Sequence, residues 1–112
     1  MVNFRINAGD LVHRVMFKRI RYKESSSGSM VPDGFTDICA ARAMVNYGRA
    51  DERRRAGIDS SEAAATIRVR TSAAVRNITA ADVIGFDGAE WNITGIVPFG
   101  QIGMDFTAIR RR

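Results

Sequence analysis

Alternation of apolar and polar residues with a period of two is the feature that most constrains this chain. It is clearest from Ala63 to Arg70, where the odd positions are apolar and Thr66, Arg68 and Arg70 are polar. Asp59-Ser60-Ser61-Glu62 before it has the composition of a helix start, but period two favours a strand. We therefore expect a half-buried strand, with Arg68 and Arg70 on the face opposite Ile67 and Val69.

Five further segments have the composition of strands. They are Val12 to Tyr22 with a bulge at Lys18-Arg19, Phe35 to Val45 ended by Asn46-Tyr47-Gly48, Asp82 to Phe86, the segment holding Trp91, Ile93 and Ile96, and Gly103 to Ile109. Asp87-Gly88 is a strong signal for a two-residue hairpin turn. The large apolar residues fall on one parity, so the predicted core contains Phe17, Phe86, Trp91, Ile93 and Phe106.

Two segments depart from this pattern. One is rich in loop-forming residues and is predicted to be a mobile contact or gating element; it comprises Glu24, Ser25, Ser26, Ser27, Gly28, Ser29, Met30, Val31, Pro32, Asp33 and Gly34. The other, Arg49 to Ala56, is predicted to be a helix, because acidic residues lie in its first turn and arginines in its last.

These elements predict a mainly β fold: a small antiparallel barrel or sandwich of about six strands, with one short inserted helix and a long hairpin loop. At 112 residues and 12.3 kDa the chain fits one domain, residues 1–112, with an N-terminal arm at 1–9 and a flexible loop at 23–34. No run approaches the ~20 apolar residues of a membrane span, and no secretory signal is recognisable. We expect no membrane contact and synthesis in the cytoplasm.

The charge is basic and the side chains suited to catalysis are few. Net charge is +5, and fifteen of the seventeen basic residues are arginines, which suit bidentate contact with carboxylate or phosphate. His13 is the only histidine, and Cys39, the only cysteine, is predicted to be a buried small hydrophobe. We expect no metal, no cofactor and no enzymatic activity. Candidate interface residues are Arg49, Glu52, Arg53, Arg54, Arg55, Arg68 and Arg70. Runs of charge such as Arg53 to Arg55 more commonly form a solvated face, and this run could also face DNA; Arg68 and Arg70 could form a solvated face.

A family resemblance begins with the pattern Gly-x-Leu-x-His-Arg-Val-x-Phe from Gly9 to Phe17. Further matching pieces follow in order: Asp37-Ile38, Ala40-Ala41-Arg42-Ala43, Gly48-Arg49 with Glu52, Ile67-Arg68-Val69-Arg70, and Gly88 with Trp91 and Ile93. Together they resemble the head-tail joining proteins, also called head-closure or stopper proteins, of long-tailed bacteriophages and of phage-derived particles such as gene transfer agents. Arg42, where an aromatic is usual, and the linker Gly100-Gln101-Ile102-Gly103 depart from the pattern.

The resemblance implies a structural protein of the neck of a virion or virion-like particle. It implies a homo-oligomeric ring below portal and adaptor proteins and above tail terminator or tail tube proteins, with double-stranded DNA passing through its channel. The loop Glu24 to Gly34 is then the candidate for closing that channel after packaging. An alternative from the residues themselves is a small β-barrel that binds single-stranded nucleic acid through its arginines and loops. The apolar parity of the aromatic residues disfavours that alternative, since stacking on bases needs exposed rings.

Overall fold

The computed structural model describes residues 5–48 and 62–111, and six strands dominate it. A short 3-10 helix and one short α-helix complete these ranges. In chain order the elements are η1 (Ala8–Asp10), β1 (His13–Glu24), β2 (Met30–Tyr47), β3 (Glu62–Arg70), α2 (Ala73–Arg76), β4 (Val83–Phe86), β5 (Ala89–Phe99) and β6 (Gly103–Arg111).

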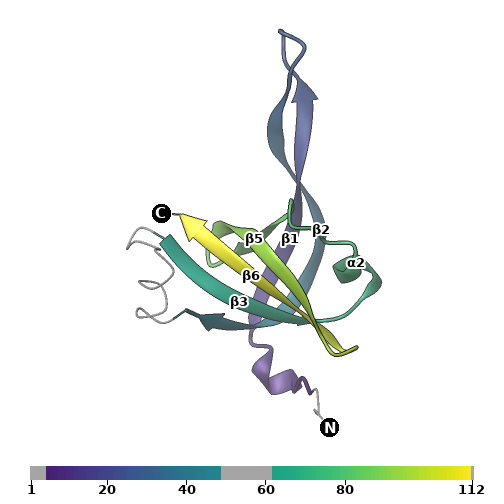
Figure 1. The fold of residues 1–112 in the computed structure, drawn as a ribbon, viewed down its shortest axis with the longest axis vertical. Coiled ribbons are helices and arrows are strands. Elements are labelled where there is room, and N and C mark those ends of the chain that lie inside the picture. The colour runs from purple at the N-terminus through teal and green to yellow at the C-terminus, as the bar shows by residue number, and fades with distance from the viewer. Residues whose placement is uncertain (1–4, 49–61, 112) are drawn as a thin grey trace.

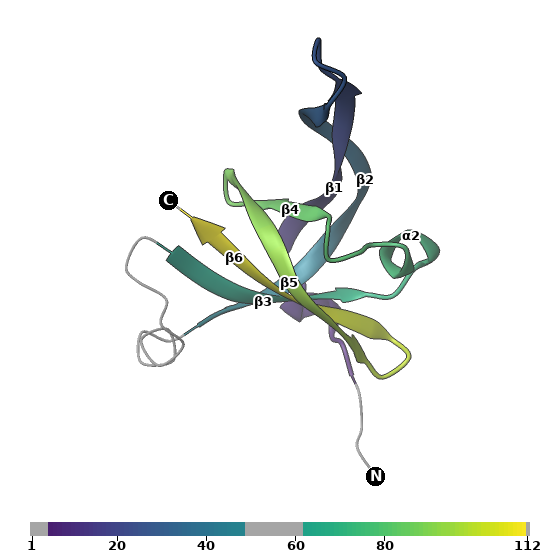
Figure 2. The same cartoon turned by 45° about the horizontal axis from the view of Figure 1, so that its top comes forward.

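The strands form one antiparallel sheet that closes into a barrel in the order β1-β2-β3-β6-β5-β4 (Figures 1 and 2). Closure comes from the pairing of β1 with β4, in which Phe17 lies opposite Ile84. The predicted antiparallel β fold with one short helix is confirmed. A closed barrel has no free sheet edge along its paired strands, which makes it a stable platform for whatever projects from it.

The barrel interior is filled by the residues whose parity marked them as core. Phe17, Ile67, Trp91 and Phe106 are completely buried, and the rings of Phe17 and Phe106 lie 5.0 Å apart. On β3 the side chains alternate as predicted, with Ile67 and Val69 inside and Arg68 and Arg70 outside. A register shift between Phe17 and Lys18 accounts for the predicted bulge.

The Asp87-Gly88 turn joins β4 to β5 as predicted. Both residues have positive φ, 55° for Asp87 and 72° for Gly88, as a two-residue hairpin with right-handed twist requires. The turn brings Trp91 back over β4, where its indole Nε1 donates a hydrogen bond of 3.0 Å to the carbonyl oxygen of Phe86. The turn therefore positions the largest core side chain.

Replacing Gly88 with alanine is expected to lower the free energy of unfolding by about 1 kcal/mol, because an L-residue with a Cβ is strained at this φ. The matched control is Gly9→Ala. An added Cβ meets nothing within 4 Å at either glycine, but only Gly88 has positive φ. Urea denaturation of both variants measures the difference, and equal stabilities would show that the turn tolerates another backbone conformation.

The helix that the structure describes lies elsewhere than the predicted one. The predicted helix, Arg49 to Ala56, falls outside the described residues. Helix α2 follows β3 and is capped at its N-terminus by Ser72, whose hydroxyl accepts a hydrogen bond from Val75 N at 3.1 Å. Val75 is buried against the barrel core, and α2 packs beside β2.

Candidate functional site

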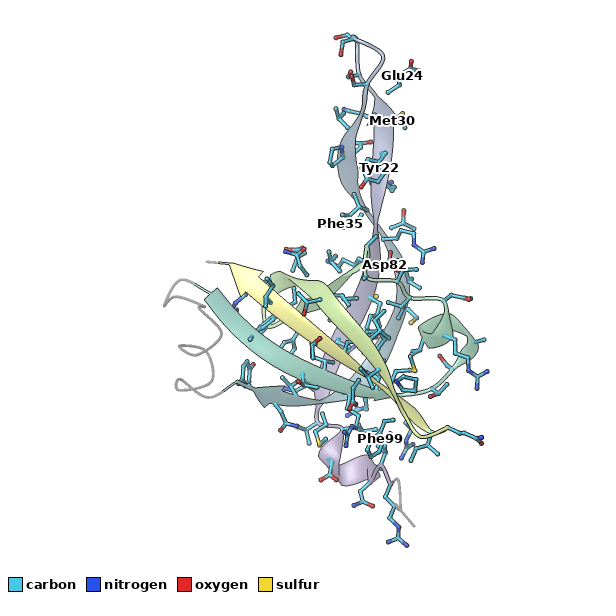
Figure 3. All side chains as sticks on the ribbon, in the orientation of Figure 1. Tyr22, Glu24, Met30, Phe35, Asp82 and Phe99 are labelled. Atoms are coloured by element: carbon cyan, nitrogen blue, oxygen red, sulfur yellow. The ribbon has the colours of Figure 1, made fainter. Side chains whose placement is uncertain are left out.

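A two-stranded arm projects from the barrel (Figures 1 and 3). It consists of Arg19–Glu24 of β1, a turn at Ser25–Ser29, and Met30–Thr36 of β2. β4 pairs with β1 only up to Lys18, and β3 pairs with β2 only from Ala43 onward. In the arm the two strands therefore pair only with each other, and both outer edges are open.

The predicted long loop from Glu24 to Gly34 is wrong in extent. Glu24 ends β1 and Met30 begins β2, so only the Ser25–Ser29 turn is irregular. That turn is closed by a hydrogen bond of 2.7 Å from Ser25 N to Ser29 O. Gly34, with φ of 74°, lies at a register shift that lets the ribbon continue through loop-forming residues. The predicted gating element is therefore the paired end of a ribbon.

One face of the arm is apolar. Residues opposite each other in an antiparallel pair share a face, and the facing pairs are Ile20 with Phe35, Tyr22 with Pro32, and Glu24 with Met30. Tyr22 is 57% exposed and Met30 63% exposed, and Figure 3 shows both beyond the barrel. Large apolar side chains gathered on a projecting element mark a contact surface.

The opposite face of the arm is mostly polar, with Val31 as its apolar residue opposite Lys23. It carries Arg21 and Lys23, and Lys23 Nζ lies 3.8 Å from Asp33 Oδ1. Both partners of this ion pair are more than half exposed, so it contributes little to stability. The arm is thus amphipathic, with one face suited to water and one suited to burial.

A buried carboxylate holds the base of the arm to the barrel. Arg19 Nε and Nη2 donate hydrogen bonds of 2.9 and 3.0 Å to the two carboxylate oxygens of Asp82, and Nη2 also donates to Asn77 O at 3.1 Å. Asp82 accepts a further bond of 2.8 Å from Thr79 N, and its side chain is only 1% exposed. The loop that precedes β4 is therefore joined to β1 at the point where the arm leaves the barrel.

The environment of Asp82 favours its charged form. Burial by itself raises the pKa of this carboxyl, but the hydrogen bonds from Arg19 and from the Thr79 N–H outweigh burial. The net result is a pKa below the usual value. The hydrogen bond and charge of Asp82 in turn raise the pKa of Arg19. Sequence reasoning missed Asp82, because an acidic residue at a strand start is usually exposed.

The predicted interface residues Arg68 and Arg70 differ in their surroundings. Arg68 donates bonds of 2.7 and 2.8 Å to Asp105, and its guanidinium lies 3.5 Å from the centre of the Phe99 ring. Arg70 is exposed and donates only a long bond of 3.5 Å to Ile6 O. Arg68 is thus held within its own chain, whereas Arg70 has no carboxylate partner among the described residues. Arg49, Glu52, Arg53, Arg54 and Arg55 lie outside those residues.

Arg70 and Arg42 both line a largely apolar pocket. The pocket measures about 320 Å³ and lies between β2 and α2. Its apolar lining includes Leu11, Cys39 and Val75. Arg42 likewise has no carboxylate partner within residues 5–48 and 62–111. The sequence marked Arg42 only as a departure from a family pattern.

Groups suited to catalysis do not converge in the described part of the chain. The His13 ring packs edge-on against Phe86 with centroids 5.3 Å apart, which is a structural contact. Cys39 is half-buried rather than fully buried as predicted, because β2 is leaving the barrel there, and desolvation raises the pKa of its thiol. Within residues 5–48 and 62–111 no three His, Cys, Asp or Glu side chains are grouped to hold a metal, and no helix there is long and apolar enough to span a membrane.

Comparisons with known proteins give a family model and several solved structures, including the following two. The model described as phage head completion protein matches residues 6–108, whereas no curated protein matches the chain. A protein from Shigella flexneri 2a, solved in solution, is 19% identical with a TM-score of 0.67, covering 95% of this chain and 96% of that one. A chain in the virion of a native gene transfer agent particle is 14% identical with a TM-score of 0.64, covering 88% and 93%. The two structures share the fold.

Proposed function

This chain belongs to the phage head completion protein family, and we propose from that membership that it forms a ring joining the head of a phage-type particle to its tail. The observation that carries the proposal is the extent of the family match, residues 6–108, which takes in both the barrel and the arm. The predicted resemblance to head-tail joining proteins is confirmed at the level of the family. The chain is a structural component of a virion-type particle.

The proposed ring lies in the neck, between portal or adaptor proteins and tail terminator or tail tube proteins. Double-stranded DNA passes through its channel, and the ring closes the head after packaging. The closed barrel supports this role, because a rigid unit tiles a ring without deforming. The arm supports it too, since an exposed apolar face on a projecting element fits a contact between proteins.

A role in the channel for Glu24 to Gly34 remains a prediction. These residues form part of a paired ribbon rather than a flexible loop, and the surface of that ribbon has to suit the channel. A ribbon with an apolar face is poorly suited to a water-filled lumen next to DNA, whose charge calls for basic or polar surfaces. Within the segment, Met30, Val31 and Pro32 are also paired with β1. We therefore assign closure of the head to the ring as a whole and the arm to contacts between proteins.

Removing the chain from a particle that encodes it is expected to leave DNA-filled heads without tails, because no other ring would present the tail docking surface. Electron microscopy of the particles and mass spectrometry of purified heads measure the outcome, with the intact chain supplied in trans as the control. Normal tailed particles without the chain would refute the proposal. Salt-dependent binding of short oligonucleotides by the isolated chain would instead favour the nucleic-acid-binding alternative.

A further inference from the structure

The lining of the pocket between β2 and α2 combines apolar side chains and the polar Thr71 and Ser72 with two exposed arginines, Arg42 and Arg70. A cavity of roughly 150 Å³ holds a molecule the size of benzene, so about 320 Å³ leaves room for a long apolar side chain. Beside the pocket, β2 pairs with β1 from Cys39 to Arg42, but its other edge has no strand partner there, because pairing with β3 begins at Ala43. The site therefore fits an apolar group that is accompanied by negative charge.

The end of the arm presents that combination. Met30 and Glu24 face each other across the ribbon at its outermost pair, next to the turn. Met30 is 63% exposed, and its unbranched side chain adapts to irregular apolar pockets. The carboxylate of Glu24 beside it complements the arginines of the pocket lining, since a carboxylate is the preferred partner of a guanidinium.

A chain cannot dock its own arm in its own pocket. Met30 and the pocket residue Ala40 lie on the same strand, and a strand rises about 3.3 Å per residue, which separates them by roughly 33 Å. The ribbon between them is paired, so it does not fold back. The occupant that matches the pocket is therefore the arm of a second copy.

We propose that the arm tip of each copy docks in the pocket between β2 and α2 of the next copy, with Met30 inserted and Glu24 facing Arg42 and Arg70. Such a contact joins two different surfaces, and a repeated contact of that kind closes into a ring when the rotation between copies allows. This inference rests on the proposed function. The inference specifies the contact that joins neighbouring subunits of the proposed ring.

Disulfide formation between copies tests this docking. In a Cys39→Ala background, Met30→Cys combined with Ala40→Cys places one thiol on the arm tip and one in the pocket of every chain. Mild oxidation of assembled particles is expected to give a ladder of multimers on a non-reducing gel. The matched control is Val31→Cys with Ala40→Cys, because Val31 lies next to Met30 on the opposite face of the arm; we expect at least roughly tenfold less ladder from it.

A charge exchange provides an independent readout. Glu24→Arg or Arg42→Glu in the Met30, Ala40 double-cysteine chain is expected to reduce the ladder roughly tenfold, and the two changes together to restore it, because the pair is attractive again. Particles that contain the chain but give no ladder, or the same ladder with Val31→Cys, would overturn the docking and leave the proposed function standing. Particles that assemble with tails and lack the chain would overturn both.

Discussion

Replacing Asp82 with alanine is expected to lower the free energy of unfolding by about 3 kcal/mol. The carboxylate accepts two hydrogen bonds from Arg19 and one from Thr79 N, and hydrogen bonds to a charged group each contribute about 1.5–3 kcal/mol. After the substitution, Arg19 can turn to water, but the N–H of Thr79 loses its partner. Chemical denaturation measures the loss.

The matched control is Asp105→Ala. Asp105 forms the same two-bonded geometry with Arg68. It is more exposed than Asp82, with 20% of its side chain accessible against 1%, so its removal is expected to cost about 1 kcal/mol. Equal losses of free energy of unfolding in the two variants would show that the burial of Asp82 adds nothing to the stabilisation by its ion pair.

The stabilisation by Asp82 depends on pH in a defined direction. Its pKa is lower in the folded chain than the value of about 3.9 for an unfolded one, so its contribution is complete above that value. It is lost as the pH falls through the folded pKa. The stability difference between the intact chain and Asp82→Ala is therefore expected to narrow from pH 5 toward pH 2. A difference that stays constant over that range would contradict this assignment.

The barrel was predictable because its signals are local. Alternation from Ala63 to Arg70 reports one buried face directly, and the Asp87-Gly88 turn specifies a hairpin by its backbone conformation alone. The core residues followed from parity, since a barrel interior admits every second side chain of a strand. No long-range information was needed for these elements.

The arm was not predictable as a ribbon, because such local signals are missing from its sequence. Both of its edges are open and most of its side chains are exposed, so burial does not impose alternation on its Ser, Gly, Pro and Asp residues. Its strands are held by pairing with each other, and single-strand composition does not report pairing. Asp82 was missed because its partner Arg19 is 63 positions away in sequence. The start of α2 carried a recognisable signal, a serine before an apolar turn, that was overlooked.

Shortening the arm is expected to abolish ring formation while leaving the barrel folded. The variant replaces residues 20–35 with Asn-Gly, a two-residue hairpin turn that joins the facing residues Arg19 and Thr36. Every fully buried core residue and the Arg19–Asp82 ion pair remain, so unfolding should stay cooperative. A lost subunit contact of about 3 kcal/mol reduces association roughly 100-fold at each interface. Circular dichroism and electron microscopy of particles carrying the variant measure fold and assembly.

The same variant separates a docking arm from a gating one, because the two roles fail differently. If the arm joins neighbouring copies, heads accumulate without a ring and without tails. If the predicted role of Glu24 to Gly34 in closing the channel holds instead, the ring forms with its tail but packaged DNA leaks, since only the obstruction is gone. The control is Lys23→Ala with Asp33→Ala, which removes the exposed ion pair on the polar face of the arm and keeps the ribbon. Its rings are expected to form normally, because that pair contributes little to stability and lies opposite the face that docks.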